Sequence, residues 1–264
     1  MRVAAGYQRA DLRWSIAGAP SGRDPNVYSE LKWRGVSGAA FGAALLWHPW
    51  RRWVVFAEGE RVFTLAGRVL DTDYGGDNRT NPTYAGRFDS PKGYGYAVSG
   101  GIGYRLLENG RFRLTPFVGY GWSGQALSVS DGGLLNSWYR TLWRGVLGRV
   151  LGEWTISGPW GVFVGGSYRQ MSYRAHADWN LIHSFAHPVS FRHWADGYGL
   201  DGTFGVRYLI GRRVGVVVEG NYFTWRTGKG VDELYLASGQ TSQTQLNEVV
   251  LTGGSIKAGV NWSW

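Results

Sequence analysis

The segment Asp71-Thr72-Asp73 places two carboxylates at a spacing that suits chemistry. Residues two apart on a β-strand project from the same face, so Asp71 and Asp73 lie side by side if this segment is a strand. Two neighbouring like charges raise the proton affinity of at least one of them. Such a pair can orient and deprotonate a water molecule. The alternative interpretation is the solvated start of a loop, because a long polar segment follows.

A second group of residues that could carry chemistry lies in one later segment. It comprises His176, Asp178, His183, His187, His193 and Asp196. Metal binding is conceivable for this composition, but the spacing matches no standard zinc motif. We therefore expect histidines that line a mouth or face solvent, and we expect no metal and no cofactor.

The motifs of common soluble enzymes are incomplete in this chain. Gly100-Gly101-Ile102-Gly103 lacks the full dinucleotide-binding spacing, and Gly228-Lys229 is followed by Gly230 instead of the Ser or Thr of a phosphate loop. Gly121-Trp122-Ser123-Gly124 is one residue short of a nucleophile elbow. Glycines of β-structure explain all three better.

The elements that must position the candidate residues are β-strands. The 264 residues include 42 Gly and 16% aromatics, and aromatic residues favour a pleated surface. No apolar run reaches the ~20 residues that a membrane-spanning helix needs. The first residues also lack the apolar core of a secretory signal, so we expect that such a signal has been removed. The net charge of +9 is spread over scattered arginines, and we expect no nucleic-acid partner.

Alternation of apolar and small polar residues is clearest at the C-terminal end. One face carries Val250, Gly254, Ile256, Ala258, Val260, Trp262 and Trp264, and the other carries Gly253, Ser255, Lys257, Gly259, Asn261 and Ser263. The pattern continues upstream, for example around 112–122, 160–169 and 214–223. A soluble sandwich strand can alternate in the same way. The terminal pair of tryptophans favours a membrane interface, where outer-membrane barrels have aromatic girdles.

Turn signals divide the chain into ten strands and one domain, 1–264. Short turns are expected near 48–51, 108–110, 157–159 and 211–212, and longer polar loops near 22–26, 77–92, 130–137, 183–188 and 237–247. The strands are then predicted near 10–19, 27–47, 52–74, 92–107, 111–130, 140–157, 160–180, 189–210, 213–237 and 247–264. This asymmetry is typical of outer-membrane barrels. The sequence therefore predicts an all-β fold, a ten-stranded antiparallel transmembrane β-barrel.

The chain resembles the omptins, outer-membrane endopeptidases of the aspartate type with a ten-stranded barrel. The similarity runs from about Ala10 to Trp264 and depends on the order of many short segments. These are Ser29-Glu30-Leu31-Lys32-Trp33, Val69-Leu70-Asp71-Thr72-Asp73-Tyr74, Val118-Gly119-Tyr120, Gly165-Gly166-Ser167-Tyr168, Val218-Glu219-Gly220 and Leu251-Thr252-Gly253-Gly254. The resemblance implies a location in the outer membrane of a Gram-negative bacterium.

The resemblance also implies a site in which a water is activated between an Asp-x-Asp pair and an Asp-x-His pair. Asp71 and Asp73 match the first pair, and Asp178 matches an Asp just before the second. Asn180 and Ile182 stand where the second pair's Asp and His are expected. His183, one position later, is then the candidate base, with Asp178 orienting it. Because Ile can neither accept nor donate a proton, the loss of the expected His costs ~10²–10⁴ in rate unless another group replaces it.

Three functions remain open at this point. The first is a surface protease or hydrolase that takes a peptide or protein substrate. The second is an inactive barrel that serves as adhesin, receptor or structural partner of an envelope complex. The third is a pore, which a ten-stranded barrel filled by side chains disfavours. The expected non-protein partner is outer-membrane lipid, lipopolysaccharide included, although of the family's lipid-contacting residues only Tyr120 is kept and Trp122 and Gly124 replace charged ones.

Overall fold

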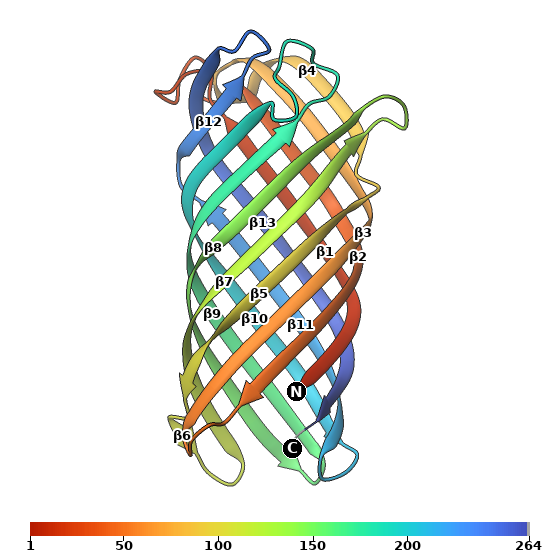
Figure 1. Cartoon of the computed structure of the whole chain (residues 1–264), viewed down its shortest axis with the longest axis vertical. Coiled ribbons are helices and arrows are strands. Elements are labelled where there is room, and N and C mark those ends of the chain that lie inside the picture. The colour runs from red at the N-terminus through yellow and green to blue at the C-terminus, as the bar shows by residue number, and fades with distance from the viewer. Residues whose placement is uncertain (263–264) are drawn as a thin grey trace.

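The chain forms one closed β-sheet, drawn in Figure 1. A computed structural model describes residues 1–262, so the predicted terminal Trp264 lies outside the described residues. All strand pairs in this part are antiparallel, and β1 (Arg2–Ile16) closes the ring by pairing with β13 (Thr241–Trp262). The segments between them are β2 (Ser29–Trp47), β3 (Trp53–Gly76), the 3-10 turn η1 (Asp77–Arg79), β4 (Thr80–Asp89), β5 (Gly93–Tyr104), β6 (Leu107–Glu108), β7 (Phe112–Ser130), β8 (Asn136–Ser157), β9 (Trp160–Asp178), β10 (Phe191–Leu209), β11 (Val214–Thr227) and β12 (Gly230–Tyr235).

Some of these segments continue a neighbour instead of adding a strand to the ring. β4 and β5 pair with β3 in one continuous register, and β6 continues β5 along β7, so the three form the fourth ring strand. β12 continues β11, because both pair with β10 and β13. Within residues 1–262 the ring therefore has ten strands, and the predicted fold class is confirmed.

Three of the predicted strand boundaries are wrong. The first strand begins at Arg2 instead of residue 10, because residues 2–9 pair with both β2 and β13. The segment 77–92 is not a loop: after the turn η1, the polar strand β4 pairs with the upper part of β3. The predicted strand 213–237 is interrupted at Gly228 and Lys229, between β11 and β12. β4 was missed because it is almost entirely exposed, so its sequence lacks the alternation of apolar and polar residues that indicates a strand.

In Figure 1 the lower half of the barrel is the half that holds the short turns and both termini. The outer face of this half is an apolar band, bordered by a row of aromatic residues at its lower edge and another at its upper edge. The lower row includes Trp53, Trp154, Trp160 and Tyr208, and the upper row includes Phe63, Tyr96, Trp122, Tyr168, Tyr198 and Tyr222, all exposed. From Trp160 to Tyr168 strand β9 advances about 20 Å along the barrel axis at the usual strand rise and tilt. These rows match the aromatic girdles of a bilayer-spanning band.

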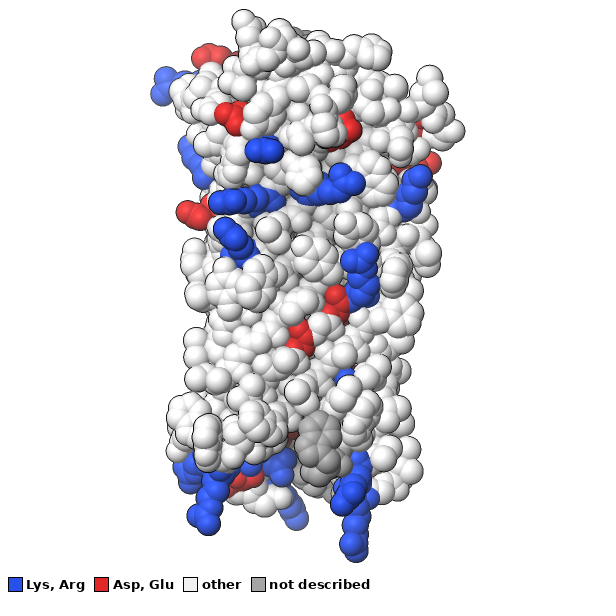
Figure 2. Space-filling view, viewed as in Figure 1, with Lys and Arg blue, Asp and Glu red and all other residues white. Residues whose placement is uncertain are grey.

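Charge is distributed along the barrel in the way that such a band requires. Figure 2 shows Lys and Arg gathered at the end that holds the short turns, a largely uncharged zone beside it, and charges of both signs over the opposite half. The part of β9 from Gln170 to Asp178 therefore lies beyond the apolar band. The long loops lie at the same end of the barrel as this part of β9. No helix among residues 1–262 is long and apolar enough to cross a membrane.

The interior of the lower half is closed by ion pairs. Arg149 binds Glu58 through both terminal nitrogens, and Arg169 lies 2.6 Å from a carboxylate oxygen of Asp201. Lys257 binds Glu60 and lies 3.6 Å from Glu219, which also binds Arg2. Paired in this way, charged groups can be enclosed without leaving an uncompensated charge. The inner face of this half is therefore largely polar, with one small apolar cluster formed by Val54, Phe56, Phe117 and Leu147.

The interior of the upper half is apolar, which the sequence analysis did not predict. Its largest fully enclosed side chains are Trp33, Trp143, Tyr139, Tyr173, Leu12, Leu31 and Leu127. Trp33 stacks on Tyr139 with ring centroids 5.1 Å apart. Above the membrane the outer face meets water, so the core of that half must form inside the ring.

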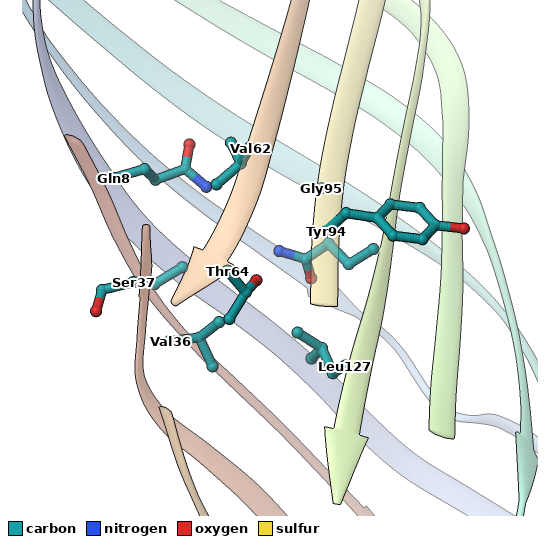
Figure 3. A pocket seen from close by; sticks show the side chains of 10 residues that line it. Gln8, Val36, Ser37, Val62, Thr64, Tyr94, Gly95 and Leu127 are labelled. Carbon is teal, nitrogen blue, oxygen red and sulfur yellow. The ribbon is translucent and has the colours of Figure 1, made fainter. Parts of the chain in front are cut away.

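A small cavity lies beside this core, between β1, β2, β3, β5 and β7. Its volume is about 10 Å³, and Figure 3 shows Gln8, Val36, Thr64 and Leu127 around it. Gln125 also lines the cavity, and its side-chain oxygen has no hydrogen-bond partner among the described residues. A cavity of this size and polarity can hold a single water molecule.

Candidate functional site

Asp71 and Asp73 lie in the upper part of β3 and face the inside of the ring. They share the side of the strand that carries Val69, which is completely buried. Asp71 pairs across β4 with Gly86, and Asp73 pairs with Tyr84. The predicted common face for the two carboxylates is therefore present, and β3 places it well above the membrane-spanning band.

The surroundings of this pair favour a protonated carboxyl group. Burial, and after it the charge of Asp73, raises the pKa of Asp71 to about 7. Burial, followed by the charges of Asp71 and Asp73, also raises the pKa of Tyr84. At neutral pH the pair can thus hold one proton, which is the condition for one acid and one base to act together.

The Asp71→Asn variant is expected to be more stable than the wild type at pH 8 and equally stable near pH 4. The folded pKa of Asp71 lies above its unfolded value of ~3.9, so the folded state binds more protons and wild-type stability falls as pH rises between about 4 and 7. Three pKa units set an upper limit of roughly 4 kcal/mol on this loss. Thermal unfolding of the refolded protein at both pH values measures it. Asp196→Asn, an exposed site on β10, is the control, and an advantage of Asp71→Asn that is independent of pH would contradict the assignment.

Residues of the first loop and of β2 hold the hairpin that carries the Asp pair. The backbone N–H of Asn26 donates to Asp77 at 2.7 Å, and the Asn26 side chain exchanges hydrogen bonds with Asn78. Arg79 reaches back to Glu30 at 2.9 Å, and Glu30 is nearly inaccessible to solvent. These contacts join the turn η1 to the first loop and to β2, so the Asp pair lies on a rigid element.

Asp178 lies at the end of β9, the seventh ring strand. Its partner is His187, whose Nδ1 lies 2.6 Å from the Asp178 carboxylate. His183, the base expected from the resemblance, is exposed and forms no hydrogen bond or ion pair within residues 1–262. The loop between β9 and β10 thus supplies an imidazole nine residues away, which no local spacing rule indicates.

Asn180 and Ile182 have no catalytic geometry. The Asn180 side-chain oxygen accepts hydrogen bonds from the Asn136 backbone at 2.9 Å and the Ser137 hydroxyl at 3.0 Å. Its amide nitrogen donates to the carbonyl of Leu134 at 2.9 Å. Asn180 therefore ties two loops together, while Ile182 is exposed.

The Asp71–Asp73 pair and the Asp178–His187 pair are separate in the described part of the chain. No hydrogen bond or ion pair within residues 1–262 joins Asp71 or Asp73 to a histidine, and no group of three or more metal-ligating side chains occurs there. β3 and β9 are four positions apart in the ring of ten. A substrate that uses both pairs must therefore span the mouth.

A buried polar network lies below the mouth and was missed by the sequence analysis. His193, which was expected to face solvent, is completely buried. Its Nδ1 lies 2.9 Å from the Tyr139 hydroxyl and its Nε2 lies 3.0 Å from Asp232, while Tyr139 and Tyr173 share a hydrogen bond of 2.6 Å. Burial raises the pKa of both tyrosines, which therefore remain neutral. These groups are enclosed by the aromatic core and have no access to a substrate, and His193 Nε2 has no hydrogen-bond partner within residues 1–262 although it lies near Asp232.

Comparison with known proteins adds one family and one fold. The sequence model of a family described as "Pom: Protochlamydia outer membrane protein" matches residues 2–264. The crystal structure of the outer membrane protease OmpT from Escherichia coli superimposes with a TM-score of 0.82 at 13% identity, covering 100% of this chain and 95% of that one. The translocator domain of the autotransporter NalP from Neisseria meningitidis gives a TM-score of 0.42 at 12% identity, covering 100% and 88%. Comparison with curated proteins gives no match.

Proposed function

Because the chain belongs to the Protochlamydia outer membrane protein family and folds as an omptin-like β-barrel of the outer membrane, we propose that it is a surface endopeptidase. Asp71 and Asp73 are the groups that activate water at its extracellular mouth. The observation that carries this proposal is the inward-facing carboxyl pair in which Asp71 retains a proton near neutral pH.

The chemistry follows from the two protonation states of the pair. Carboxylates two residues apart on a strand are separated by about 7 Å along it, which leaves room for a water molecule between them. The Asp73 carboxylate accepts a proton from this water as the water oxygen attacks the carbon of the peptide carbonyl. Asp71 donates its own proton to the carbonyl oxygen. When the tetrahedral intermediate collapses, the leaving nitrogen takes the proton that Asp73 received and the C–N bond breaks. One hydroxyl of the intermediate returns its proton to Asp71 as the new carboxyl group forms, so both aspartates regain their starting states.

We assign the second half of the site to Asp178 and His187. The Asp178 carboxylate binds Nδ1 of the imidazole, which leaves Nε2 free to exchange a proton with a substrate bound across the mouth. The carboxylate also stabilises the charged ring, as in other Asp–His pairs.

Two histidine variants test whether His187 or His183 is the base. His187→Ala is expected to lower the cleavage rate of a peptide containing Arg and Lys by about 10²-fold or more. His183→Ala, in the same loop, is expected to change the rate less than twofold. The measurement is kcat for a fluorogenic basic peptide with the refolded protein in lipid. Absence of cleavage by the wild type would overturn the proposed function, and the reverse order of the two variants would overturn the assignment of His187.

A second candidate is a barrel that binds peptides or proteins without cleaving them. Two observations favour it: the Asp71–Asp73 pair shares no contact with the Asp178–His187 pair, and Asp178 is on the side of β9 opposite the buried Ala177. In this case the same peptide would bind at the mouth and be recovered intact, and Asp71→Asn would change its Kd but release no products.

A further inference from the structure

A groove crosses the lipid-facing side of the barrel, away from the site described above. It runs over β9, β10, β11, β13 and β1 within the apolar band and has a volume of about 740 Å³. Its walls are the exposed side chains of Tyr7, Phe204, Tyr222 and Ile256. A bilayer component must fill this space, because apolar surface left without contacts loses their dispersion energy.

Glycines form the floor of this groove. Gly202, Gly220 and Gly254 line it on three adjacent strands. A Cβ atom built on Gly202 meets nothing within 4 Å, and one built on Gly220 meets only a backbone oxygen at 4.0 Å. Larger residues would therefore fit the barrel at these two positions and would fill the groove instead.

One cation lies at the upper end of the groove. Arg9 follows Tyr7 on the outer face of β1 and is the single charged residue of the lining. It is exposed and forms no ion pair or hydrogen bond with the described residues, whereas the next acidic side chain on that face, Asp11, is bound by Arg34. Arg9 sits just above Tyr7, at the level where lipid headgroups begin.

We propose that the groove binds one membrane lipid, with an acyl chain over the glycine floor and an anionic phosphate headgroup at Arg9. The apolar length of the groove matches a hydrocarbon chain, and the unpaired guanidinium matches a phosphate. The groove is distinct from the wall formed by β7, where Tyr120 and Trp122 pack against each other at 4.7 Å. The proposal does not depend on the endopeptidase function.

Photolabelling in nanodiscs tests this binding site. The full chain is placed in phosphatidylcholine discs with a small fraction of phosphatidylglycerol that carries a diazirine on its acyl chain, and labelled peptides are mapped by mass spectrometry. Labelling is expected to concentrate on β10, β11 and β13. The double variant Gly202→Leu/Gly220→Leu should lower it there to the level of the opposite wall. Arg9→Gln should lower it about fivefold but leave labelling by diazirine-phosphatidylcholine unchanged.

A matched control is Gly148→Leu, on the lipid-facing side of β8 and outside the groove, where an added Cβ also meets nothing within 4 Å. It should label like the wild type. Uniform labelling around the barrel, or labelling that survives the double variant, would overturn the proposal. A wild-type dimer in native mass spectrometry that the double variant abolishes would also overturn it, because a second copy of the chain would then occupy the groove. An unchanged Arg9→Gln would overturn the headgroup assignment.

Discussion

Asp71→Asn is expected to lower kcat for peptide cleavage by a factor of about 10²–10⁴, the usual contribution of a positioned acid or base. Asn has nearly the same shape as Asp and remains compatible with β3, but it has no proton to donate to the peptide carbonyl. The buried position beside Asp73 is what gives Asp71 this proton at neutral pH. Cleavage of a basic peptide by the refolded variant measures the effect.

The pH profile distinguishes this role from a structural one. An acid must be protonated, so the wild-type rate should fall about tenfold per pH unit once pH rises above the Asp71 pKa of about 7. The residual rate of Asp71→Asn should lack this descending limb. Asp196→Asn serves as the control for general charge effects, and heat-modifiable migration on gels verifies that each variant is folded. A variant that cleaves as fast as the wild type, or that keeps the same descending limb, would exclude Asp71 as the acid.

The ring could be predicted from sequence because the alternation has a constant phase within the membrane. On β9 the outward Val162, Val164 and Tyr168 alternate with the inward Ser167 and Arg169. Lipid accepts only the apolar face, so the pattern is clear there.

The same strand explains why the apolar interior of the upper half was not predicted. Beyond Gln170 the polarity of the two faces reverses: Met171 and Tyr173 point inward and are buried, while Arg174 points outward. The strand keeps its geometry, but water replaces lipid outside and an apolar core replaces the ion pairs inside. Thr252 on β13 marks a similar reversal, since Val249 and Leu251 are buried on the inner face. A change of phase in the apolar alternation is the signal that could have revealed the core.

One part of the candidate site could be predicted from the sequence and the other part could not. The common face of Asp71 and Asp73 follows from a spacing of two on one strand, so the sequence was sufficient to predict it. The contact between Asp178 and His187 depends on how the loop between β9 and β10 folds back. The support from Asn26 to the turn η1 links residues about fifty positions apart. Contacts of this kind leave no periodic trace in a single sequence.

The upper core provides the largest expected effect on stability. Trp143→Ala is expected to lower the free energy of unfolding by about 3–5 kcal/mol, as for other large aromatic residues removed from a core. The indole is only 1% exposed and packs against Tyr173 and Trp225, with ring centroids 4.4 Å and 5.8 Å away. Urea titration of the refolded barrel in lipid vesicles measures the change.

Trp138→Ala is the matched control for this prediction. Trp138 lies on the same strand, β8, but on the outer face, where it contacts Arg140. Its removal should cost about 1 kcal/mol or less, because a cation–π contact and partial burial are all that it loses. If the upper interior is a tightly packed core, the two variants must differ severalfold. Equal losses would mean that the interior above the membrane tolerates a cavity, and that the rigid support inferred for the mouth is absent.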